Sequence, residues 1–169
     1  TGGTIDFTGA GTLRLASSVT SLGTLDDADG TVEYDGANNS VVAATYNNLA
    51  ISTAGTKTTS GNITVNNDLT TAATSNCKLD MGANSVALKG DLNVGANDGL
   101  DLSDVSCVFT MSGSSAQNIT HAGATGSGTE VTETGESGLG GLSTTGNVSF
   151  TTTSSYYKNG SNSIYNDYT

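Results

Sequence analysis

Short alternations of apolar and polar residues recur along this chain, and most of them end at a glycine. The clearest copies are Thr4–Gly9, Thr31–Gly36, Ser85–Gly90 and Val108–Gly113. A further copy, Lys57–Gly61, keeps the glycine but has no apolar pair. Alternation with a period of two is typical of a strand with one buried face, and glycine is a turn residue. The pattern therefore predicts short β-strands that end in turns.

The closing glycines define a repeat. They lie 27, 25, 29 and 23 residues apart, at Gly9, Gly36, Gly61, Gly90 and Gly113, and we interpret them as structural turns. Further apolar pairs at i and i+2, such as Ile63 with Val65 and Leu79 with Met81, fall between them. A repeat of roughly 20–50 residues indicates stacked structural units. We therefore predict an all-β fold, a parallel β-solenoid (β-helix) with three short strands per coil of ~26 residues.

A β-sandwich is the alternative fold, because it also consists of short strands separated by turns. A sandwich does not need a long repeat, so the spacing of the glycines favours the solenoid. Only one face of each solenoid strand points inward, and the core is narrow. A chain with 34% hydrophobic residues can therefore fill such a core.

The pattern divides the chain into three parts. Residues 1–120 carry the solenoid repeats, and 121–145 are rich in Gly, Ser and Thr, which predicts an irregular coil or loop. Residues 146–169 resume with a strand and a tyrosine-rich tail. We expect this tail either to cap the end of its own solenoid or to dock on a neighbouring subunit. The residues considered for intersubunit docking are Phe150, Tyr156, Tyr157, Tyr165 and Tyr168.

Composition excludes several classes of partner. The net charge is −11, with only five Lys and Arg residues, so no basic patch is available to bind nucleic acid or an anionic membrane surface. No apolar run is long enough to predict membrane insertion as a helix. Proline is absent, which suits a chain made mostly of paired strands. Because the chain starts at Thr1, we expect a processed or excised segment.

Residues for catalysis are sparse. His121 is the single histidine, and no serine has the glycine pattern of a nucleophile elbow. Asp98, Asp101 and Asp104 are candidate carboxylates for glycoside cleavage, but Trp is absent and no sugar cleft with aromatic walls is indicated. We therefore predict that the protein is not an enzyme.

Two features leave metal and redox chemistry open. The segments Asp26–Gly30 and Gly95–Asp101 resemble parts of calcium-binding loops, although ordinary turn chemistry explains both. We predict no cofactor, with calcium as the alternative. Cys77 and Cys107 lie 30 residues apart, close to one repeat, and form either a disulfide between neighbouring coils or two buried thiols.

Several segments resemble repeats of known proteins. They are Gly30–Gly36, Tyr46–Ser52, Gly61–Leu69 and Phe109–Ile119. They look like the units of large repeat-containing bacterial cell-surface and secreted β-solenoid proteins, most of which are adhesins, passengers or uncharacterised surface proteins. The resemblance covers residues 1–120 and implies an extracellular or cell-surface location.

These observations lead to two functional hypotheses. The first is a non-enzymatic structural protein whose copies assemble end to end into a filament, sheath or surface layer, since stacking of open solenoid ends generates filaments. The second is an adhesin-like segment that binds glycans or another cell surface. In both hypotheses the protein acts outside the cell, without a reaction of its own.

Overall fold

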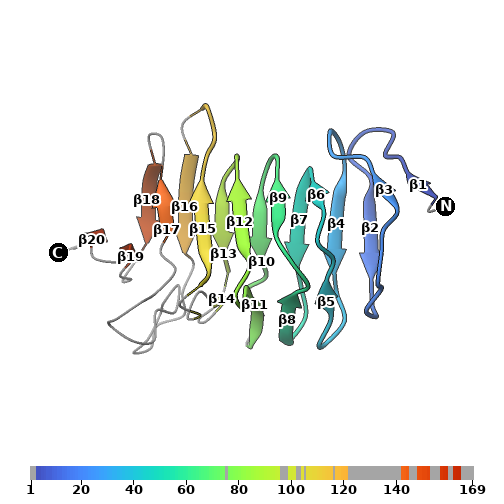
Figure 1. The fold of residues 1–169 in the computed structure, drawn as a ribbon, viewed down its shortest axis with the longest axis horizontal. Helices are drawn as coiled ribbons and strands as arrows, with labels where there is room; N and C mark the ends of the chain where they lie inside the picture. The colour runs from blue at the N-terminus through green and yellow to red at the C-terminus, as the bar shows by residue number, and fades with distance from the viewer. Residues whose placement is uncertain are drawn as a thin grey trace.

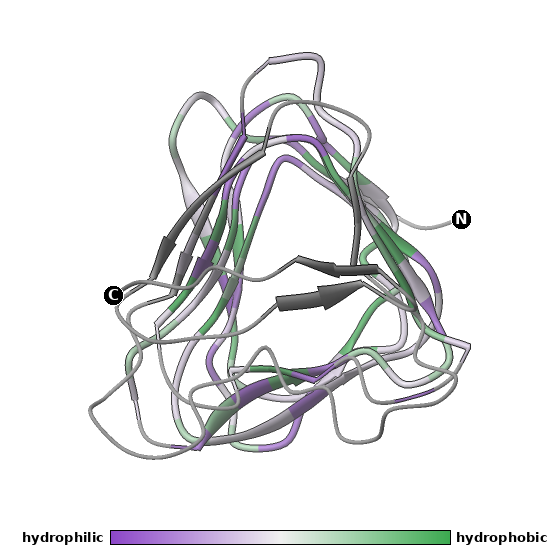
Figure 2. Cartoon of the chain, turned by 90° about the vertical axis from the view of Figure 1, so that its left-hand side faces the viewer, coloured by the Kyte–Doolittle hydropathy of each residue, from purple (hydrophilic) through white to green (hydrophobic). Residues whose placement is uncertain are grey.

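The chain folds into a three-sided β-rod (Figure 1). This computed structural model describes residues 3–74, 76–95, 99–101, 104, 106–115, 117–121, 142–144, 148–152, 157–159 and 162–164. All of the described elements are β-strands, and the strands of each long sheet pair in parallel. Figure 2, viewed along the rod, shows the coils as stacked triangles. The architecture is the predicted β-solenoid, with about five turns and three strands per coil.

Three sheets form the sides of the rod. The seven-stranded sheet contains β2 (Thr12–Leu15), β4 (Thr31–Tyr34), β7 (Asn48–Ile51), β10 (Leu69–Thr71), β13 (Leu92–Val94), β16 (Gln117–His121) and β18 (Val148–Thr152). The four-stranded sheet contains β5 (Ser40–Val41), β8 (Gly55–Thr59), β11 (Cys77–Asp80) and β14 (Leu100–Asp101). The five-stranded sheet contains β6 (Thr45–Tyr46), β9 (Ile63–Val65), β12 (Ser85–Leu88), β15 (Val108–Met111) and β17 (Leu142–Thr144). Two short pairs complete the fold: β1 (Thr4–Ile5) with β3 (Thr24–Leu25), and the antiparallel pair β19 (Tyr157–Asn159) with β20 (Asn162–Ile164).

The core consists of columns of inward-facing apolar side chains. One column of the seven-stranded sheet runs through Leu13, Val32, Leu49, Leu69 and Leu92, which the strand register aligns. From Val32 onward its members are at most 1% exposed. Each rung covers the apolar surface of the next. This burial stabilises the fold by ~25 cal/mol for each Å² of apolar surface removed from water.

The coils are not equal in length. Register partners on the seven-stranded sheet are 17 residues apart at Thr31 and Asn48, but 31 residues apart at Ile119 and Phe150. The glycine-ended segments therefore do not mark one position of the coil. The glycine-ended segments at β4, β8 and β12 fall on three different sheets. The chain between two of these successive segments therefore makes one full coil plus one further side of the rod. Only the segments at β12 and β15 are true repeats, with Ser85 paired to Val108.

The interior also contains fully buried polar groups. Tyr34 and Tyr46 lie with their hydroxyl oxygens 3.0 Å apart. The Val42 amide donates to Tyr34 Oη at 3.0 Å, and Tyr46 Oη donates to the Val42 carbonyl. Burial raises the pKa of both phenols. The ring of hydrogen bonds satisfies both hydroxyls, as a buried polar group requires.

Lys57 is a second buried polar group. It lies on β8, in the repeat that lacks an apolar pair. Its side chain is fully buried. The ammonium Nζ donates to the carbonyl oxygens of Thr53 (2.7 Å), Ala54 (3.3 Å) and Gly55 (3.3 Å), and to Thr53 Oγ1 (3.3 Å). Burial lowers the pKa of Lys57. The lysine thus ties together the corner between β7 and β8.

Candidate functional site

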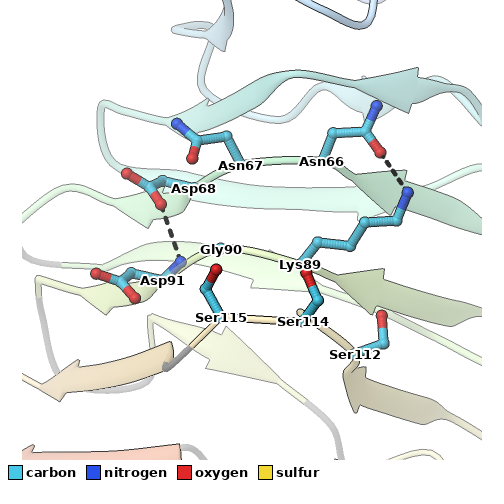
Figure 3. Close-up of a pocket in the computed structure, with 9 residues that line it drawn as sticks. All are labelled: Asn66, Asn67, Asp68, Lys89, Gly90, Asp91, Ser112, Ser114 and Ser115. Atoms are coloured by element: carbon cyan, nitrogen blue, oxygen red, sulfur yellow. Dashed lines mark hydrogen bonds between the residues drawn. The ribbon is translucent and has the colours of Figure 1, made fainter. Parts of the chain in front are cut away.

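A polar groove follows the corner where the chain passes from the five-stranded to the seven-stranded sheet (Figure 3). Its volume is about 700 Å³. The lining residues come from three successive coils and are Asn66, Asn67, Asp68, Lys89, Gly90, Asp91, Ser112, Ser114 and Ser115. The register of β9, β12 and β15 places Asn66, Lys89 and Ser112 at equivalent positions, one per coil. Repetition of one corner therefore generates the groove.

The lysine of the groove contacts an amide instead of a carboxylate. Lys89 Nζ donates to Asn66 Oδ1 at 2.7 Å, and Lys89 is exposed. Asn66 Nδ2 in turn donates to the carbonyl of Asp27 at 3.0 Å. The two ion pairs within the described part of the chain, Arg14–Glu33 and Lys78–Asp101, lie elsewhere. Lys89 thus presents a cationic donor to the groove.

A ladder of side-chain acceptors forms the opposite wall. Asn48 Oδ1 accepts the Asp68 amide at 3.2 Å, Asp68 Oδ1 accepts the Asp91 amide at 2.9 Å, and Asp91 Oδ1 accepts the Asn118 amide at 2.8 Å. Each side chain thus accepts a backbone amide of the next coil at the entry to the seven-stranded sheet. Asp68 uses only one carboxylate oxygen in this ladder, so its second oxygen can bond outward.

Glycine at Gly90 and Gly113 lets the corners stack closely. A Cβ on Gly90 would lie 2.3 Å from the Asn67 carbonyl oxygen, and one on Gly113 would lie 2.1 Å from that of Lys89. Any side chain would therefore separate the coils. The other proposed turn glycines, Gly9, Gly36 and Gly61, also lie between strands.

The described candidate catalytic residues have different partners. Asp101 pairs with Lys78 at 3.0 Å, and Asp104 Oδ1 accepts the Ser106 amide at 2.8 Å. His121 ends β16 on another sheet, in register with Val94. Asp98 lies outside the described residues.

The acidic loop at Asp26–Gly30 forms a turn. Asp26 accepts the amides of Ala28 at 3.0 Å and Phe7 at 3.3 Å. These backbone hydrogen bonds lower the pKa of Asp26. Among the described residues, no three His, Cys, Asp or Glu side chains gather as a metal site would require.

Cys77 and Cys107 are buried free thiols in this structure. Cys77 begins β11 and pairs in register with Gly55, whereas Cys107 directly precedes β15. The two cysteines therefore occupy different positions of the coil. Burial, with the nearby charges of Asp104, Asp101 and Asp80, raises the pKa of Cys107 to about 12. Burial also raises the pKa of Cys77, so both thiols are protonated at neutral pH.

The proposed docking residues are only partly within the described chain. Phe150 lies in β18, in register with Ile119 of β16. Tyr157 lies in β19 opposite Ile164. Tyr156, Tyr165 and Tyr168 lie outside the described residues.

Comparison with protein families, with curated protein sequences and with solved structures finds no match for this chain. Among the described residues, no helix has the length and hydropathy needed to cross a membrane. The fold and the groove are therefore the basis for any functional argument.

Sequence analysis did not identify the groove. Its signal is the pair Asp68-Leu69 and Asp91-Leu92, which recur 23 residues apart with Asn66 and Lys89 two residues before each aspartate. Such a signal is readable only once the coil register is known, because the glycine spacing predicts a different alignment.

Proposed function

We propose that this chain is a non-enzymatic structural protein of the cell exterior, whose copies associate end to end through their solenoid edges. The observation that supports this proposal is the incomplete burial of apolar side chains in the first coil. Leu13 and Leu15 on β2 are half-buried, whereas their register partners Val32 and Tyr34 are at most 1% exposed. The described residues therefore cover one rung of an apolar column incompletely.

The backbone of β2 supports the same proposal. β2 is the edge strand at the N-terminal end of the seven-stranded sheet. The carbonyls of Gly11 and Leu15 accept amides of the next coil at 2.8 and 3.1 Å, from Thr31 and Asp35. In a parallel strand the intervening residues turn their backbone groups to the other edge. A strand from a second copy would satisfy those groups and cover the half-buried leucines.

Electron microscopy and sedimentation velocity of the 169-residue chain test this proposal. We expect regular filaments or discrete end-to-end assemblies at physiological ionic strength. Leu13→Lys places a charge on the inward side of the edge strand and should abolish them. Arg14→Lys, on the outward side of the same strand, is the matched control and should assemble normally. A monomeric wild-type chain, or assembly that survives Leu13→Lys, would contradict the proposal.

The tail needs a separate test. β19 and β20 pair with each other, and β19 contacts β17, so the pair lies beside the last described coil, where it either caps the chain's own end or docks on a neighbour (Figure 1). Truncation after Thr153 distinguishes this cap from intersubunit docking. If the truncated chain assembles like wild type but unfolds at lower temperature, the tail is a cap. If it stays folded and monomeric, the tail docks on a neighbour.

A further inference from the structure

We propose that the corner groove binds a neutral oligosaccharide. The groove is a concave site of about 700 Å³, and its lining side chains are all polar. The lining offers convergent hydrogen-bond donors and acceptors to a polyhydroxylated ligand, although it has no aromatic wall. The proposal does not depend on end-to-end assembly, because the groove lies along the side of the rod.

The groove combines donors and acceptors. On one side is the Lys89 ammonium, which has donors to spare beyond its bond to Asn66. On the other side are the carboxylates of Asp68 and Asp91, one coil apart. Figure 3 shows the hydroxyls of Ser114 and Ser115 between these two sides, on the third coil. Sugar hydroxyls donate to carboxylates and accept from ammonium groups, and such charge-assisted bonds are the strong ones.

The charge of the site selects a neutral ligand. The lining carries two carboxylates, Asp68 and Asp91, against one cation, Lys89, and the whole chain carries −11. An acidic polysaccharide would therefore meet net repulsion. An apolar ligand would find no apolar side chain in the lining. A neutral polyol avoids the charge repulsion and can form hydrogen bonds with the polar lining.

The floor of the groove is fixed before the ligand arrives. Gly90 lets its corner stack closely on Asn67, and the hydrogen bond from the Asp91 amide to Asp68 holds the acceptor wall. A site that is already ordered loses little conformational entropy on binding. The repetition of the corner also allows a chain of sugar units to lie across successive coils.

Calorimetric titration with neutral hexasaccharides of glucose, mannose and galactose tests the proposal on the intact chain. A hexasaccharide of galacturonic acid serves as the charged comparison, and calcium chloride as the cation comparison. We expect saturable binding of at least one neutral sugar, and weaker binding of the acidic one. Failure of every neutral sugar to bind, or preference for the acidic sugar or for calcium alone, would overturn the proposal.

Two variants locate the binding. Asp68→Asn removes the charge but keeps the Oδ1 acceptor, as Asn48 does in the same ladder. Lys89→Met removes the ammonium from an exposed position. Each should weaken sugar binding by about tenfold, which corresponds to ~1.4 kcal/mol, with unchanged circular dichroism. Asp80→Asn on the four-stranded sheet is the control and should bind like wild type. Equal binding by all three variants would place the sugar elsewhere and refute the assignment.

Discussion

Two neighbouring strands of the four-stranded sheet carry different side chains at equivalent inward positions. On β8 the inward residues are Lys57 and Thr59; in the next coil Leu79 lies inward on β11, and the buried Met81 directly follows that strand. The register pairs Lys57 with Leu79 directly. All four side chains are at most 5% exposed. The same interior position therefore accepts an amine in one coil and an isobutyl group in the next.

The difference teaches that hydrogen-bond satisfaction decides which polar groups the core tolerates. Lys57 has four acceptors at the corner formed by Thr53, Ala54 and Gly55. Thr59 Oγ1 donates to the Met81 carbonyl at 2.8 Å and accepts from Asn84 at 3.0 Å. At β11 the environment supplies apolar contacts instead. The polar rung is stable only with its local partners, since a buried group without them costs several kcal/mol.

Leu79→Lys should break this comparison most severely. It places a second lysine one coil away from Lys57, at a position packed for a leucine. We expect a loss of at least ~3 kcal/mol in the free energy of unfolding, or failure to fold. Urea unfolding followed by circular dichroism measures the loss. Ala87→Lys, on the outward face of β12, controls for the added charge and should cost little. A Leu79→Lys variant as stable as that control would refute the argument.

The sequence pattern predicted the inward position of only one of these two rungs. Leu79 with Met81, and the segments at β12 and β15, follow the apolar alternation that predicted the solenoid. Lys57 breaks that alternation, and its place in the core depends on carbonyls that turn toward it at the corner. Sequence patterns contain side-chain polarity but not the direction of backbone carbonyls. The same limit hid the groove, because its residues converge only through the coil register.

Lys57→Ala and Lys57→Met should separate the packing of the lysine stem from the bonds of its ammonium. The alanine variant loses both and should be destabilised by ~3 kcal/mol. The methionine variant fills similar space but leaves the corner carbonyls without their donor, at a cost of ~1 kcal/mol. Equilibrium unfolding of both variants gives the two values. If Lys57→Met were more stable than wild type, desolvation of the amine would outweigh its hydrogen bonds.

Thr59→Val should have a smaller effect, because the substitution preserves shape and removes one hydroxyl. The Met81 carbonyl loses its donor and Asn84 loses an acceptor. We expect a loss of ~1 kcal/mol in the free energy of unfolding. Thr58→Val, at the adjacent exposed position, is the matched control and should change stability by less than ~0.5 kcal/mol. Equal effects at the two positions would mean that the buried hydroxyl contributes nothing.

The smallest expected effect is the pH dependence that Lys57 introduces. Burial lowers the pKa of Lys57 below its ordinary value of 10.5, so the folded chain releases this proton at lower pH than the unfolded chain. The contribution of this shift to stability is present above pH 10.5 and is lost as pH falls through the folded pKa. The stability of wild type relative to Lys57→Met should therefore rise as pH increases toward 10.5. Comparing the two chains cancels contributions that are the same in both. One of these comes from the Cys107 thiol: because its pKa is raised to about 12, its contribution to stability is lost as pH rises above the ordinary value of 9.0. A difference that stays constant up to pH 10.5 would show that the corner carbonyls hold the lysine fully charged, and that burial does not favour its neutral form.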